Sequence, residues 1–131
     1  MSEKLKDMSI AAFVDLTASD APAPGGGSVS ALFGALSAAL TGMVAGLTVG
    51  KKKYVEVEAE MREVAAAAEA LKNELVEEID RDSESFNEFM AAMALPKNTD
   101  EEKAARKAAM QNGLKSAAKV PCHVAETAAR I

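Results

Sequence analysis

The sequence is poor in aromatic residues and contains no tryptophan. Aromatic side chains make up 4% of the 131 residues, so large rings cannot supply most of a core. Alanine is abundant, and leucine, valine and seven methionines provide much of the other apolar volume. Thin, alanine-rich elements that approach one another closely are typical of helices packed on helices. The composition therefore predicts a single all-α domain over residues 1–131.

The sequence also contains little cysteine and no excess of basic residues, and both facts exclude certain functions and cellular locations. The single cysteine, Cys122, excludes an intrachain disulfide. The formal net charge is -5, and the 15 basic residues are interleaved with 20 acidic ones, which argues against a nucleic-acid-binding face. The first 16 residues carry charges where a secretory signal peptide has an apolar run. We therefore expect a cytoplasmic protein with no nucleic-acid partner.

No charged residue occurs between residues 28 and 49. Small residues recur there every four positions, at Gly34, Ala38, Gly42 and Gly46, a spacing that lets another helix approach closely. The run is long enough to cross a membrane, but only nine of its 22 residues are strongly apolar. A helix that is apolar on all sides also suits the centre of a bundle or a dimer. We expect this buried arrangement and no membrane span.

Periodicity and capping residues predict three further helices. A serine can cap a short helix over residues 9–17. A long helix over residues 54–95 contains no glycine or proline, and we expect it to be the centre of a helical bundle. A T-x-x-E capping box begins a fourth helix over residues 99–119, which Pro121 kinks or restarts. The pattern stops at Ile131 without a cap, so we expect a domain truncated at its C-terminus.

One carboxylate, Asp82, interrupts the apolar stripe of the long helix. A carboxylate on a buried stripe is costly unless it is paired or lies in a solvated site, so Asp82 is a candidate for acid–base chemistry or ligand recognition. The alternative is that Asp82 lies at the wet edge of the core. The expected stripe is Val57, Met61, Val64, Ala68, Leu71, Leu75, Ile79, Asp82, Phe86, Phe89 and Met93. The acidic residues expected on a solvated face are Glu77, Glu78, Asp80 and Glu84.

Two prolines and three consecutive glycines precede the uncharged run, in the stretch DAPAPGGGS. Free backbone N–H groups at the start of a helix form a ready site for a carboxylate or phosphate. The spacing of Gly25, Gly26 and Gly27 matches neither common nucleotide-binding motif. The alternative is a flexible turn that lets Ser28 or a glycine cap the helix. On the residues alone, the two interpretations stand about equal.

The other candidate groups carry no recognisable chemistry. His123 and Cys122 lack the spacing of a metal site, and no nucleophile motif is present. We expect both to be packing residues and expect no metal site. Lys51 to Lys53 are expected at a solvated helix end, where cations are favourable, and the alternative is that they bind a ligand with a glutamate tail.

Several motifs together closely resemble the cyclodeaminase/cyclohydrolase family. They are APAPGGGSVSAL, LTVGKKKY, DRDSESFNEFMAAMALPK and the later KVP. This helical domain forms the second half of formiminotransferase-cyclodeaminase and also occurs as a free-standing folate enzyme. The resemblance covers essentially the whole chain, although family domains continue for several helices beyond the position of Ile131.

The resemblance implies a homodimer that binds tetrahydrofolate derivatives and needs no metal or redox cofactor. Members hydrolyse 5,10-methenyltetrahydrofolate to 10-formyltetrahydrofolate, or cyclise 5-formiminotetrahydrofolate with loss of ammonia. A free-standing domain slightly favours the cyclohydrolase reaction. The rival class is a non-catalytic helical self-assembly or folate-binding module.

Family motifs also suggest individual site residues. The glycine motif falls on Gly25, Gly26, Gly27 and Ser28, which are expected to bind the substrate, and the acidic position falls on Asp82, which is expected to be catalytic or to hold the pterin amino groups. Lys97 closes the L-P-K turn, where it would favour an anionic tail.

Overall fold

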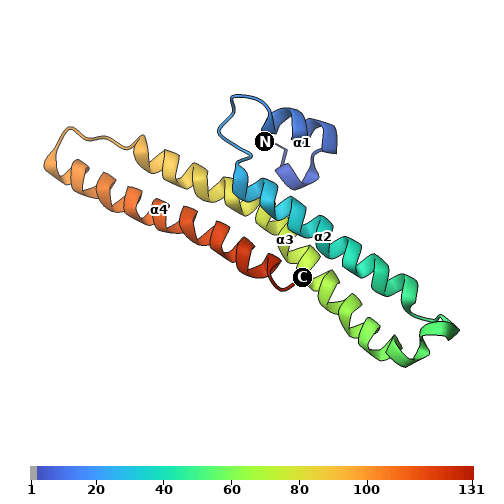
Figure 1. The fold of residues 1–131 in the computed structure, drawn as a ribbon. Coiled ribbons are helices and arrows are strands. Elements are labelled where there is room, and N and C mark those ends of the chain that lie inside the picture. Colours follow the sequence, from blue (N-terminus) through green and yellow to red (C-terminus); the bar gives the residue numbers. More distant parts are fainter. Residues whose placement is uncertain (1–2) are drawn as a thin grey trace.

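The computed structural model describes residues 3–131 as an elongated molecule of helices and turns (Figure 1). Within this range no β-strand occurs, and the all-α prediction is confirmed. Four α-helices and two 3-10 turns follow one another along the described residues. They are η1 (Leu5–Asp7), α1 (Ile10–Thr17), α2 (Gly26–Thr48), η2 (Lys52–Val57), α3 (Glu58–Met93) and α4 (Asp100–Ala128).

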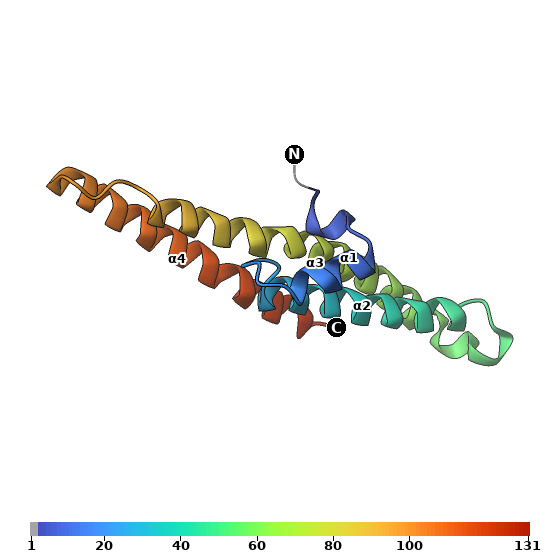
Figure 2. The same cartoon turned by 90° about the horizontal axis from the view of Figure 1, so that it is seen from above.

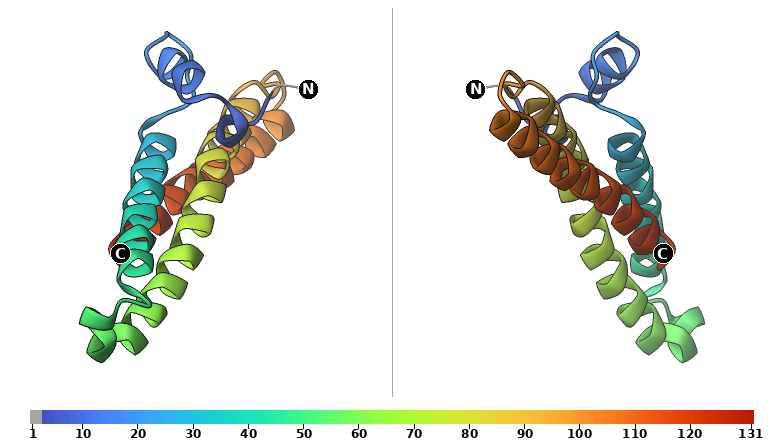
Figure 3. Two further views of the ribbon diagram at one scale, coloured as in Figure 1. Left: turned by 90° about the vertical axis from the view of Figure 1, so that its right-hand side faces the viewer. Right: turned by 90° about the vertical axis from the view of Figure 1, so that its left-hand side faces the viewer.

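Helix α3, with 36 residues, is the long central element of the fold. Helix α2 runs along its N-terminal half and α4 along its C-terminal half, while α1 lies near the start of α2 (Figures 1 and 2). Helix α4 begins beside the end of α3 and reaches α2 only near its own C-terminus (Figure 3). All three long helices therefore meet only around the middle of α3. The core there consists of Phe13, Ala31, Ala35, Leu75, Ile79 and Val124.

The two predicted helix caps are confirmed. Ser9 Oγ accepts a hydrogen bond from the backbone N–H of Ala12 at 3.1 Å and begins α1. Thr99 Oγ1 accepts from the N–H of Glu102 at 3.1 Å, and the Glu102 carboxylate accepts from the N–H of Thr99 at 3.2 Å. These bonds satisfy backbone donors that have no partner inside the helices.

Helix α2 begins at Gly26 with Gly25 as its N-cap, which agrees with the alternative that a glycine caps this helix. The predicted start of the long helix is wrong, because residues 52–57 form a 3-10 turn and α3 begins at Glu58. Helix α4 passes through Pro121 as one continuous helix, whereas a kink or restart was expected. Pro121 has no backbone N–H, so one helical hydrogen bond is lost there without ending the helix.

The apolar stripe of α3 is buried only where other helices cover it. Ala68, Leu71, Leu75 and Ile79 are buried as predicted. Val57 and Met93, at the two ends of the stripe, are exposed. Both lie far from the region in which three helices meet, so the prediction of a uniformly inward stripe is wrong at its ends.

The small residues of α2 bring this helix close to α3. A Cβ added at Gly34 would lie 3.0 Å from a Leu75 methyl carbon, and one added at Gly42 would lie 3.6 Å from Ala68 Cβ. Ala38 is fully buried between them. Gly46 faces open space and does not take part. The four-residue repeat therefore serves mainly an intrachain helix contact.

The opposite face of α2 carries a band of exposed apolar residues, which we call the α2 stripe. Its side chains are 52% to 66% exposed, so the expected burial of this helix on all sides is not achieved within the chain. By length and composition α2 could also cross a membrane. The absence of a membrane span stays a prediction. The stripe consists of Phe33, Leu36, Leu40, Met43, Val44 and Leu47.

Candidate active site

Asp82 on α3 points at the first turn of α2. Its Oδ2 accepts a hydrogen bond from the backbone N–H of Ser28 at 2.9 Å. A carboxylate at this position pairs with the positive end of the helix dipole and caps a free backbone donor. The negative group at the start of α2 is therefore the Asp82 carboxylate, which belongs to the same chain.

Ser28 lies behind Asp82 and fixes its position. Its Oγ donates to the backbone carbonyl of Ile79 at 2.7 Å and lies 3.3 Å from Asp82 Oδ2. Ser28 is 0% exposed, so its side chain cannot contact another molecule directly and can affect one only by positioning Asp82. A second serine, Ser85, donates to the backbone carbonyl of Asp82 at 2.8 Å.

The three glycines have different surroundings. A Cβ added at Gly27 would lie 2.6 Å from Asp82 Oδ2 and closer still to Oδ1, so a side chain at this position cannot coexist with the observed Asp82 conformation. Nothing lies within 4 Å of a Cβ added at Gly25 or Gly26. Packing inside the chain therefore requires glycine at Gly27 but at neither of the other two positions.

A cavity of about 230 Å³ opens beside Asp82, and we call it the Asp82 pocket. The loop between α1 and α2, the first turn of α2, and parts of α3 and α4 enclose it. Among the described residues, no donor bonds to Asp82 Oδ1, so this oxygen remains free to accept a proton or a hydrogen bond. The residues that matter for its chemistry are Pro22, Gly25, Gly26, Asp82, Ser83 and Phe86.

Lys97 lies elsewhere. It is exposed in the turn after α3, and the helix between Asp82 and Met93 alone spans about 16 Å. Together with Lys103, Arg106 and Lys107 it lines a separate hollow of about 520 Å³. Within one chain, the structure brings Gly25 and Gly26 to the Asp82 pocket but does not bring Lys97 there.

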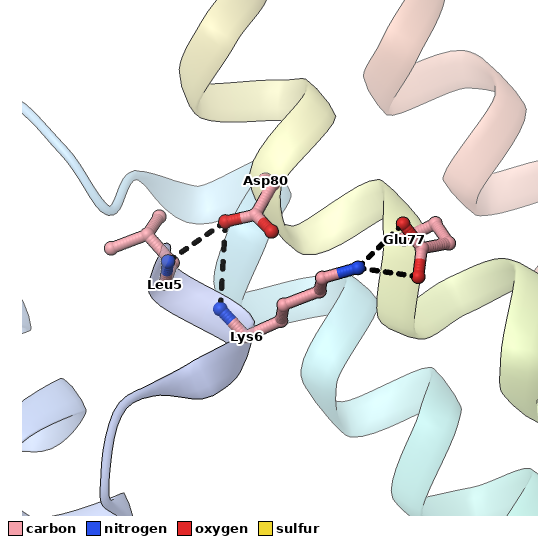
Figure 4. A network of polar contacts seen from close by, with 4 residues as sticks. All are labelled: Leu5, Lys6, Glu77 and Asp80. Atoms are coloured by element: carbon pink, nitrogen blue, oxygen red, sulfur yellow. Dashed lines mark hydrogen bonds and ion pairs between the residues drawn. The ribbon is translucent and has the colours of Figure 1, made fainter. Parts of the chain in front are cut away.

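Two carboxylates expected on a solvated face are buried, and that prediction is wrong for both. Asp80 is 7% exposed, and its Oδ1 accepts from the N–H groups of Leu5 at 2.8 Å and Lys6 at 3.5 Å (Figure 4). The Lys6 ammonium also contacts Glu77 at 2.6 Å, and this hydrogen bond lowers the pKa of the Glu77 carboxyl below its usual value. The N-terminal segment thus covers a face of α3 that the helix periodicity assigned to solvent.

Glu78 is the second buried carboxylate, at 2% exposure. Its Oε1 accepts from Arg81 at 2.9 Å, and His123 on α4 lies 2.8 Å from Glu74 and 3.9 Å from Glu78. His123 therefore links α4 to α3 through close polar contacts with two carboxylates, and its assignment as a packing residue is wrong. Cys122, assigned the same role, is exposed.

In the part of the chain that the structure describes, no group of three or more His, Cys, Asp or Glu side chains is arranged to hold a metal ion. The chemistry that the Asp82 pocket itself offers is proton transfer at Oδ1 and recognition of N–H groups. Both would act on a molecule placed between the glycines of α2 and the side chains of α3.

Comparison with known proteins gives consistent matches. Residues 9–131 match the family described as formiminotransferase-cyclodeaminase. Over 112 residues the chain is 54% identical to methenyltetrahydrofolate cyclohydrolase of Methylorubrum extorquens, covering 86% of this chain and 54% of that protein. Over 116 residues it is 43% identical to formimidoyltransferase-cyclodeaminase of Gallus gallus, covering 88% of this chain and 21% of that protein.

A solved structure agrees with the sequence matches. The crystal structure of formiminotetrahydrofolate cyclodeaminase from Thermotoga maritima matches with a TM-score of 0.78 and 35% identity. The match covers 95% of this chain and 58% of that one, so the chain spans little more than half of either the cyclohydrolase or the solved cyclodeaminase. On sequence and fold together, the chain belongs to the formiminotransferase-cyclodeaminase family.

Proposed function

We propose that the chain binds a tetrahydrofolate derivative at the Asp82 pocket and moves protons at its one-carbon unit. The observation that carries this proposal is the free Oδ1 of Asp82, held over the glycines of α2 at the edge of a cavity. A carboxylate fixed through one oxygen keeps the other oriented, which favours general acid–base catalysis. The family membership supplies the substrate class.

In the hydrolytic reaction, water adds to the methenyl carbon that bridges N5 and N10, and Asp82 accepts the proton that this water loses. The hydroxyl group of this adduct then loses its proton to solvent and becomes the formyl carbonyl as the bond from carbon to N5 breaks, and N5 takes up a proton from the same carboxyl group. The product is 10-formyltetrahydrofolate, and one proton is released overall. Asp82 thus serves first as the general base and then as the general acid.

In the cyclising reaction, N10 attacks the carbon of the protonated formimino group on N5, whose nitrogen already carries two hydrogens, and the bond from that carbon to this nitrogen breaks. Asp82 takes the N10 proton and returns it to the nitrogen, which leaves as ammonia. The oxidation level of the carbon does not change in either reaction, so neither requires electron transfer. We accordingly propose a folate substrate and no redox cofactor, and the expectation of no metal stays a prediction.

Cyclohydrolase is the favoured assignment of the two reactions. Its support is the 54% identity to a methenyltetrahydrofolate cyclohydrolase, compared with 43% to a formimidoyltransferase-cyclodeaminase. The test is to incubate the purified chain with each substrate and follow the methenyl absorbance. Loss of absorbance above the uncatalysed rate supports hydrolysis, and formation of absorbance from the formimino substrate supports cyclisation. If neither change occurs, the assignment as an enzyme is contradicted.

A second copy of the chain is proposed as the partner of the α2 stripe. The stripe exposes six large apolar side chains on one helix face, and a self-complementary contact between two such helices would remove them from water. This face also favours the rival assignment of a non-catalytic assembly module. Light scattering tests the dimer, and turnover of methenyltetrahydrofolate distinguishes the enzyme from the module.

Two finer assignments also stay proposals. Lys97 lies outside the Asp82 pocket and would attract an anionic substrate tail that extends from it. The neighbouring cations Lys103, Arg106 and Lys107 would add to this attraction. A cytoplasmic location remains a prediction from the amino-acid composition.

A further inference from the structure

We propose that the Asp82 pocket takes the pterin ring of the folate and excludes its glutamate tail, with Phe86 as the flat wall on which the ring lies. This inference rests on the proposed function and adds the orientation of the substrate and a positioning residue. It is carried by three features of the pocket: its charge, its size and the placement of its one aromatic ring.

The charge of the pocket favours the pterin end. Its lining includes the carboxylate of Asp82 and the hydroxyl group of Ser83, but no lysine, arginine or histidine. Asp82 also already bonds the Ser28 amide at the start of α2. A carboxylate tail would meet a like charge here, whereas the pterin ring carries no carboxylate, and its N5 edge with the one-carbon unit can lie beside the free Oδ1.

The size of the pocket limits it to one end of the molecule. At about 230 Å³ it is smaller than the roughly 300 to 1,000 Å³ typical of sites that enclose a whole drug-sized ligand. One fused ring system can enter, while the aminobenzoyl-glutamate part must lie outside. The tail would then extend over the surface, where cationic groups such as those around Lys97 are available.

Phe86 is placed to hold a flat ring. It follows Asp82 by four residues, one helical turn, so both side chains lie on the same side of α3. The sequence stripe assigned Phe86 to the core, yet it is only partly buried and lines the pocket with Pro22. A ring stacked on Phe86 would present its N5 edge to Asp82 and be covered by the loop between α1 and α2, which carries Pro22.

The experiment uses the stable analogue 5-formyltetrahydrofolate bound to the intact chain. We expect nuclear Overhauser contacts between the Phe86 ring and protons of the reduced pterin ring. Replacing the aromatic face in Phe86→Leu should weaken binding of this analogue about three- to ten-fold. The matched control is Phe89→Leu on the same helix, because Phe89 contacts Gly113 and does not line the pocket. Its affinity should equal that of the parent.

Contacts from Phe86 to the benzoyl protons, or unchanged affinity in Phe86→Leu, would overturn the proposed orientation. If the Phe86 variant does not fold, the contacts in the parent chain decide the question alone. Turnover of methenyltetrahydrofolate together with benzoyl contacts would leave the proposed function standing and remove only this inference. Failure of the chain both to bind the analogue and to turn over either substrate would remove both.

Discussion

Replacing Gly27 by alanine should destabilise the fold, while the same change at Gly26 should not. The new Cβ at position 27 would overlap the Asp82 carboxylate, which must move and give up its bond to the Ser28 amide. Overpacking costs about 1 to 3 kcal/mol, and loss of a helix cap costs about 1 kcal/mol more. The expected loss of unfolding free energy is therefore about 2 to 4 kcal/mol.

Thermal unfolding followed by circular dichroism measures this loss. For a chain of this size, it corresponds to a melting temperature lower by roughly 6 to 20 °C. Gly26→Ala is the matched control, because a Cβ at position 26 meets nothing within 4 Å. It should raise stability by about 0.4 to 1 kcal/mol through a less flexible unfolded chain.

A double-mutant cycle with Asp82→Ala tests the cause directly. Removing the carboxylate makes room for the Cβ at position 27, so Gly27→Ala should cost at least about 1 kcal/mol less in that background. Equal stability of the Gly27→Ala and Gly26→Ala chains would refute the close approach of Asp82 to α2. Strict additivity in the cycle would assign the loss to some other contact of Gly27.

Three further predictions concern the rest of the chain. Gly113→Ala should lower the unfolding free energy by about 1 to 3 kcal/mol, because its Cβ would lie 2.9 Å from the Phe89 backbone. The control Gly46→Ala meets nothing within 4 Å and should raise the unfolding free energy by up to about 1 kcal/mol. Similar urea midpoints for the two variants would contradict the α3–α4 contact. Gly42→Leu should overpack the contact with Ala68 and cost about 1 to 3 kcal/mol, and an unchanged melting temperature would count against that contact. In Lys6→Met, an NMR titration should show the pKa of Glu77 rising towards its ordinary value. A lowered carboxyl pKa stabilises the fold above the unfolded-state value and loses this effect as pH falls through the folded-state value. Any stability advantage of the parent should therefore decrease as the pH falls below about 4.3, the ordinary pKa of a glutamate. An unshifted Glu77 titration would show that the pair does not form.

Local signals in the sequence predicted the helices well. The caps at Ser9 and Thr99 depend on residues three positions apart, and the structure forms both. The small-residue repeat of α2 likewise predicted a close helix contact, and Gly34 and Gly42 lie against α3. Such features require only neighbouring residues or one regular face, both of which can be recognised without knowing the partner.

Features that depend on distant segments were harder to predict. Asp80 and Glu78 looked solvated because periodicity alone cannot show that residues 5–6 and α4 pack over those faces. The apolar composition of α2 was clear, but which neighbour covers each of its faces was not. Asp82 was recognised because it broke a regular stripe, although its role as a cap on α2 depends on a residue 54 positions earlier in the chain.

The most direct test of the central claim is the turnover of 5,10-methenyltetrahydrofolate by Asp82→Asn. Asparagine keeps the size of the side chain and an oxygen that can accept from the Ser28 amide, but it cannot accept and return a proton at Oδ1. If Asp82 is the acid and base, the maximal rate should fall roughly 10²- to 10⁴-fold while circular dichroism shows an intact fold. Full activity with unchanged affinity in the folded variant would contradict the account.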